Sequence, residues 1–131
     1  MPTLGHALPQ LFVTDFARAL AFYRDVLGFD VVYTYGEPPF YGMVQCGQAQ
    51  LNLRHVDASP WRGEVRTHDD LLAAGIPVDD IAALYGEMQE REVPIHQPLT
   101  TQPWGLRDFI VADPDGNRIG FHGASPTEAD A

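Results

Sequence analysis

Residues 13–20 read VTDFARAL, and residues 78–85 read VDDIAALY, so one pattern occurs twice with Asp15 and Asp80 in equivalent places. The two aspartates are 65 residues apart, which is half of the 131-residue chain. In each copy an apolar, strand-like run ends at the aspartate and apolar residues then recur at helical spacing. An aspartate carboxylate accepts hydrogen bonds from the free N–H groups of a first helical turn. The repeat therefore predicts two copies of one unit, each with a helix that starts at the aspartate.

The segments around each predicted helix are typical of short β-strands. One helix is expected over residues 15–27, where Gly28 follows as a C-terminal cap, and the other over residues 80–91. Alternating runs separated by Gly, Pro, Asn and Asp predict one strand before each helix and three after it. The expected strands are residues 8–14, 29–35, 40–46 and 49–55, then 71–78, 93–97, 106–112 and 117–123.

These elements predict a single α+β domain made of two tandem βαβββ modules. We place module one at about 7–56, a linker at about 57–69, module two at about 70–123, and a polar tail at 124–131. Long loops are expected at residues 56–70 and 98–105. Residues 113–117 should form the tight turn between the last two strands.

Composition and charge narrow the classes of partner. The chain carries 18 acidic against 8 basic residues, a formal net charge of −10, so a phosphate backbone would be repelled and nucleic acid is not expected. No apolar stretch approaches the ~18 residues of a membrane span, and residues 1–10 lack the pattern of a secretory signal. The single cysteine, Cys46, cannot form an intramolecular disulfide and fits a reducing, cytoplasmic compartment.

Two stretches resemble signatures of a known family. Residues 15–29, DFARALAFYRDVLGF, resemble the first-helix signature of the glyoxalase/bleomycin resistance/dioxygenase superfamily, also called vicinal oxygen chelate proteins. Residues 113–119, DPDGNRI, resemble the closing turn and last strand of that family. The resemblance implies the glyoxalase/bleomycin resistance/dihydroxybiphenyl dioxygenase fold, a curled mixed sheet around a cavity with helices outside. It also implies a homodimer.

The metal-ligand positions implied by the resemblance carry unsuitable side chains. They fall on Leu8, Asn52, Ala73 and Gly120, of which only the asparagine has a donor atom, and that donor is weak. We therefore expect neither a metal nor another cofactor. The metal-free branch of the family is best known from bleomycin-resistance proteins, which bind a cationic drug without modifying it. Trp104, between a proline and a glycine, and Trp61 in the linker resemble aromatic positions of that branch.

Strand alternation sorts the remaining candidates onto the face away from each helix. Its polar and aromatic side chains suit a ligand site, although a solvated sheet face is an alternative. Indole rings there would stack on a planar or cationic ligand. The candidate ligand-binding residues are Trp104, Trp61, Asn52, Arg54, Tyr33, Tyr41, Phe12, Phe109, His6 and His122.

The function predicted from these features is metal-independent binding. The chain would sequester a cationic or aromatic compound in a groove at a dimer interface, and no residue is assigned a catalytic role. One alternative is a metal-dependent lyase, isomerase or dioxygenase of the same superfamily with relocated ligands, for which His6 and His122 are candidates. Another is a protein whose cavity is filled by its own side chains.

Overall fold

The computed structural model describes residues 2–60 and 71–124, which fall into two compact units. The first unit ends at Pro60 and the second holds the rest of the chain, so we describe each by itself. Residues 61–69 of the predicted linker and 125–131 of the predicted tail lie outside the described residues, as does Trp61.

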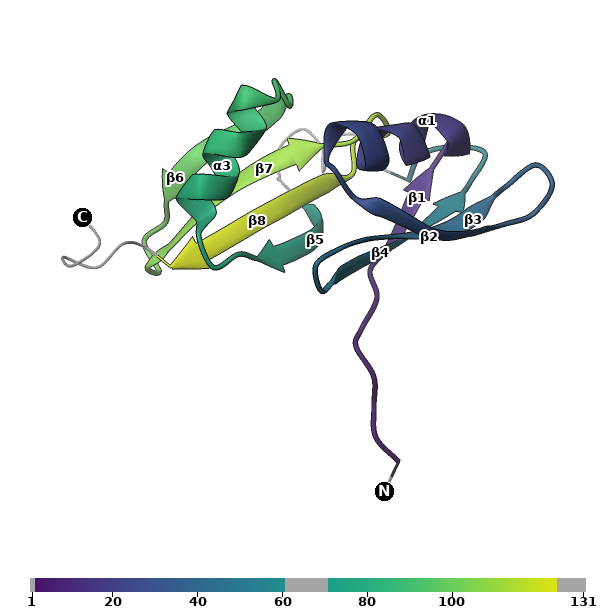
Figure 1. The fold of residues 1–131 in the computed structure, drawn as a ribbon, viewed down its shortest axis with the longest axis horizontal. Coiled ribbons are helices and arrows are strands. Elements are labelled where there is room, and N and C mark those ends of the chain that lie inside the picture. Colours follow the sequence, from purple (N-terminus) through teal and green to yellow (C-terminus); the bar gives the residue numbers. More distant parts are fainter. Residues whose placement is uncertain (1, 61–70, 125–131) are drawn as a thin grey trace. The chain divides into compact units, whose positions relative to one another are not determined.

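The first unit is one four-stranded mixed sheet with a helical segment on one face (Figure 1). Its strand order is β1-β4-β3-β2, in which β1 runs parallel to β4 and the other pairs are antiparallel. The elements are β1 (Gln10–Val13), α1 (Phe16–Ala21), the π-helical turn η1 (Phe22–Val26), β2 (Asp30–Tyr35), β3 (Tyr41–Cys46) and β4 (Ala49–His55).

The second unit repeats this arrangement, with strand order β5-β8-β7-β6 and a parallel β5–β8 pair (Figure 1). Its elements are β5 (Leu72–Pro77), α3 (Ile81–Glu90), β6 (Ile95–Thr101), β7 (Leu106–Ala112) and β8 (Arg118–Ala124). The predicted repeat of two βαβββ modules is confirmed.

The two aspartates that define the repeat cap the two helices. A carboxylate oxygen of Asp15 accepts a hydrogen bond from the backbone N–H of Arg18 at 3.1 Å, and Asp80 accepts one from Ala83 at 3.0 Å. Each bond satisfies a first-turn donor that has no partner inside the helix. Both helices therefore begin where the sequence predicts.

In each unit the apolar core lies between the sheet and its helix. In the first, alternate residues of β1 and β4 pack under the helix, and Leu11, Val13 and Leu53 have no exposed surface. In the second, Phe109 of β7 lies between two rings, 5.1 Å from that of Tyr85 on α3 and 5.2 Å from that of Phe121 on β8. Helix packing thus occupies one face of each sheet, and the residues between these positions lie on the other face.

Three elements differ from the sequence-based prediction. The first helix widens after Ala21, where the backbone N–H of Leu27 bonds the carbonyl of Phe22, five residues back. The first strand begins at Gln10 rather than at residue 8. Finally, β6 continues through Pro98, for which the sequence predicts a loop. An edge strand tolerates proline, and the register shifts in this strand accommodate it.

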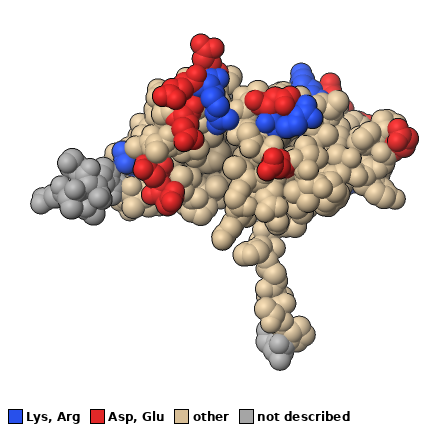
Figure 2. All heavy atoms as spheres, viewed as in Figure 1, with Lys and Arg blue, Asp and Glu red and all other residues tan. Residues whose placement is uncertain are grey.

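Charged groups gather on the helical side of each unit. Figure 2 shows acidic and basic side chains together over α3, and again over α1 and η1. Arg24 and Asp25, both exposed, form an ion pair at 2.8 Å. No helix of that part of the chain is long and apolar enough to cross a membrane.

Candidate functional site

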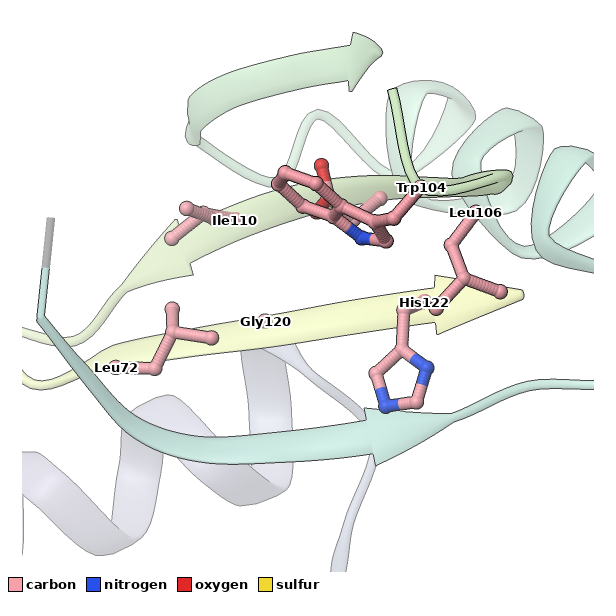
Figure 3. Close-up of a pocket in the computed structure, with 7 residues that line it drawn as sticks. Leu72, Trp104, Leu106, Ile110, Gly120 and His122 are labelled. Carbon is pink, nitrogen blue, oxygen red and sulfur yellow. The ribbon is translucent and has the colours of Figure 1, made fainter. Parts of the chain in front are cut away.

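A hollow of about 180 Å³ lies on the face of the second sheet that α3 leaves uncovered. We call it the Trp104 pocket. Figure 3 shows side chains from β5, β7 and β8 projecting on the same side, with the indole of Trp104 above β7. The lining residues are Leu72, Trp104, Leu106, Asp108, Ile110, Gly120 and His122.

The strand register places these residues together. On β7, Asp108 and Ile110 lie opposite His122 and Gly120 of β8, so two adjacent cross-strand pairs form the floor. A Cβ atom at Gly120 would come within 2.8 Å of a methyl group of Leu72. The hollow therefore depends on a glycine at the position where the resemblance implies a metal-binding carboxylate.

Trp104 lies at the tip of the turn that joins β6 to β7. The backbone N–H of Gln102 bonds the carbonyl of Leu106 at 2.7 Å, and that of Gly105 bonds the carbonyl of Gln102 at 3.1 Å. Gly105 has φ of 92°, a conformation that L-residues with a Cβ rarely adopt. The tight turn presents the indole beside the floor of the pocket with 69% of its surface exposed.

Asp108 is the acidic residue of the pocket, and sequence reasoning missed it. One carboxylate oxygen accepts two amide hydrogen bonds, at 2.8 Å from Gln97 and at 2.9 Å from Gln102. Both donors are neutral, and no ion pair to Asp108 exists in the described part of the chain. The alternation of Leu106, Asp108 and Ile110 along β7 could have placed the carboxylate on this face.

A separate polar network lies on the uncovered face of the first sheet. The amide nitrogen of Asn52 donates to the hydroxyl oxygen of Tyr41 at 3.0 Å, and that hydroxyl donates to the side-chain oxygen of Gln10 at 3.1 Å. Asn52 is only 4% exposed, and its side-chain oxygen is buried without a partner. An unpaired buried acceptor is costly, so this oxygen is poised to accept a hydrogen bond.

The other candidates of the first unit fall into two groups. Phe12, Tyr33 and Arg54 lie on the same face as Asn52, because their register partners alternate with the buried residues of β1, β3 and β4. The rings of Tyr33 and Tyr41 have centroids 6.5 Å apart. His6 instead lies in the exposed segment before β1, outside the sheet.

In the second unit, the structure places Trp104 and His122 in the pocket but Phe109 elsewhere. Phe109 has no exposed surface and belongs to the core under α3, so its assignment as a ligand-lining residue was wrong. The error was one of strand parity, because adjacent residues of β7 point to opposite faces.

The described residues contain no group of three or more His, Cys, Asp or Glu side chains that could hold a metal ion. The pocket contains one such acid and one such base, Asp108 and His122, on adjacent strands. What this arrangement can do chemically is to bind: it offers apolar walls, an aromatic face and one fixed carboxylate.

Comparisons with known proteins identify the fold and its relatives. Residues 3–121 match the family model described as Glyoxalase/Bleomycin resistance protein/Dioxygenase superfamily. A bleomycin resistance protein of Geobacillus stearothermophilus is 29% identical over 129 residues, which cover 88% of this chain and 93% of that protein.

Two solved structures share the fold. The bleomycin-binding protein of Streptomyces verticillus, complexed with copper(II)-bleomycin, has a TM-score of 0.72 at 25% identity and covers 96% of this chain and 100% of its own. TnmS3, an antibiotic binding protein of Streptomyces sp. CB03234, has a TM-score of 0.69 at 29% identity, covering 95% and 100%. The resemblance predicted from residues 15–29 and 113–119 is thus confirmed.

Proposed function

Because the chain belongs to the Glyoxalase/Bleomycin resistance protein/Dioxygenase superfamily, we propose that it binds an aromatic small molecule and sequesters it without changing it covalently. The observation that carries this proposal is the Trp104 pocket, which an exposed indole lines together with the apolar side chains of Leu72, Leu106 and Ile110. A relative named a bleomycin resistance protein, and structures of a bleomycin-binding and an antibiotic binding protein, support the same class of function.

The pocket suits a planar group of a larger ligand. Sites for drug-sized molecules enclose roughly 300–1,000 Å³. The Trp104 pocket, at about 180 Å³, holds less than that, so we infer that it takes one part of the ligand. The apolar walls favour aromatic or aliphatic surface, and the indole provides a face for stacking.

The proposal also covers the oligomeric state of the protein and its cellular compartment. We infer that the protein acts as a homodimer, with the ligand groove completed at the interface, and that it acts in the cytoplasm. The open edges of both four-stranded sheets support pairing, since unpaired strand edges favour association. The single cysteine supports a reducing compartment. No feature of the described residues favours the metal-dependent alternative.

Titration with metal-free and copper(II)-loaded bleomycin tests the proposed function. We compare the wild type with Trp104→Ala, which removes the aromatic face, and with Trp104→Phe, which keeps one. Loss of a stacked ring costs roughly 1–3 kcal/mol, so the alanine variant should bind about tenfold to a hundredfold more weakly and the phenylalanine variant much less so. Calorimetry gives the affinities, and circular dichroism checks the fold. Equal binding by wild type and Trp104→Ala would contradict a role for the pocket.

A further inference from the structure

We infer that Asp108 makes the Trp104 pocket selective for an organic cation, so that the group bound there carries an ammonium or amidinium charge. This inference rests on the proposed function and names the chemical class that the same site prefers. The group that selects the cation is the Asp108 carboxylate, which hydrogen bonds fix in the floor of the pocket.

The hydrogen bonds of Asp108 hold the carboxylate in one orientation without neutralising it. Gln97 and Gln102 both donate to the same oxygen, at 2.8 and 2.9 Å. Neutral amides stabilise a negative charge but leave its sign unchanged. Within the described residues no side chain donates to the second carboxylate oxygen, so that oxygen is available to accept a bond from a ligand.

Among the described residues, three basic side chains lie on β7 and β8 near Asp108 in sequence or register. The guanidinium-bearing Arg118 lies on the same face of β8, but four residues from His122 and hence about 13 Å away along the strand. Arg107, next to Asp108 on β7, has the opposite parity. His122 is the cross-strand partner of Asp108, yet among the described residues no ion pair or hydrogen bond joins their side chains.

The surroundings strengthen the preference for a cation. Leu72, Leu106 and Ile110 line the same hollow and offer apolar contacts to the organic part of a cation. The indole of Trp104 lines the same hollow, and its electron-rich face also attracts cations. Apolar walls, an indole and one uncompensated carboxylate together match a flat or alkyl-substituted organic cation.

Three naphthalene probes with one ring system and three charges test this inference. They are 1-naphthylmethylammonium, 1-naphthylmethanol and 1-naphthoate, and their affinities are measured by NMR titration. The wild type should bind the ammonium compound about tenfold more tightly than the alcohol, with the carboxylate weakest, because hydrogen bonds to charged partners are the stronger ones. This ranking needs no variant and so does not depend on how a variant folds.

The variant Asp108→Asn provides the second arm, since its carbonyl oxygen can still accept the two amide bonds. Its ratio of affinities for the ammonium and the alcohol probe should fall from about ten to about one, because the charge that distinguishes the two probes is gone. Glu90→Gln is the matched control: it removes the same charge from an exposed position on α3, on the other face of the sheet, and should change nothing.

The outcomes separate this inference from the proposed function. Equal affinity of the wild type for the ammonium and alcohol probes, with both weakened by Trp104→Ala, would overturn the role of Asp108 and leave aromatic binding intact. Equal losses in Asp108→Asn and Glu90→Gln would also overturn it, because overall charge would then be the cause. Failure of all three probes to bind the wild type would contradict the proposed function itself.

Discussion

Asp108 on β7 and His122 on β8 are direct cross-strand partners, and both side chains line the Trp104 pocket. Directly opposed residues of antiparallel strands have Cβ atoms about 4.5–5.5 Å apart, close enough for their side chains to interact. A permanent positive charge at residue 122 would therefore sit next to the carboxylate. A cationic side chain at residue 122 could therefore occupy the position that we propose for the cationic ligand.

The variant His122→Lys should occupy that site with its own ammonium group. We expect the affinity for 1-naphthylmethylammonium to fall about tenfold, because the new ion pair competes with the probe, while the affinity for 1-naphthylmethanol stays within about twofold. NMR titration measures both. His122→Gln serves as the neutral control and should keep the wild-type preference; unchanged ammonium binding by the lysine variant would argue against the pairing.

Filling the floor of the pocket should weaken binding without unfolding the protein. In Gly120→Ala the new methyl group would lie 2.8 Å from Leu72, which must shift, and Leu72 can do so because it is 47% exposed. We expect several-fold weaker binding of all the naphthalene probes and a loss of roughly 1 kcal/mol in the free energy of unfolding. Gly75→Ala is the control, since its methyl group would meet only His122, at 3.9 Å. Equal binding by both variants would contradict this account.

Glycines outside the pocket should respond according to their backbone conformation. Gly86 lies inside α3, and a methyl group added there would meet nothing within 4 Å, so Gly86→Ala should raise the free energy of unfolding by about 0.5–1 kcal/mol. Gly105 has φ of 92°, so Gly105→Ala should lower the free energy of unfolding by about 1–2 kcal/mol. Urea denaturation followed by circular dichroism measures both changes. A stabilised Gly105→Ala would show that the turn is less constrained than described.

The repeat made the fold predictable, because the two capping aspartates fix where each helix starts and the strands follow by alternation. The site was harder to predict. Nothing in the sequence distinguishes Asp108 from an ordinary polar strand residue. Its orientation depends on hydrogen bonds from Gln97 and Gln102, and both glutamines lie in or beside a stretch for which the sequence predicts a loop. Phe109 was misplaced by one residue of strand parity, whereas the turn that carries Trp104 was predictable because a proline and a glycine flank this residue.

The assembly proposed for the protein makes a direct prediction about mass. Light scattering at micromolar concentration should give about twice the 14.5 kDa of one chain, because open sheet edges favour pairing between copies. The aromatic side chains on edge strand β2, where Tyr35 is 67% exposed, add apolar surface that association would cover. A mass of one chain across the micromolar range would contradict the homodimer and the shared groove.

The last prediction concerns the unpaired oxygen of Asn52 in the first unit. Leucine branches at the same carbon as asparagine and has no polar atom, so Asn52→Leu removes a buried acceptor that has no partner. Tyr41 loses one incoming bond but keeps its own bond to Gln10. We expect the free energy of unfolding in urea to rise by up to about 1 kcal/mol, whereas Asn52→Asp should lower it, because a charge would be buried among neutral groups. An acceptor that is buried without a partner costs free energy, so the leucine variant should be the more stable protein. If Asn52→Leu instead loses more than about 1 kcal/mol, the asparagine is a structural residue held by its bond to Tyr41.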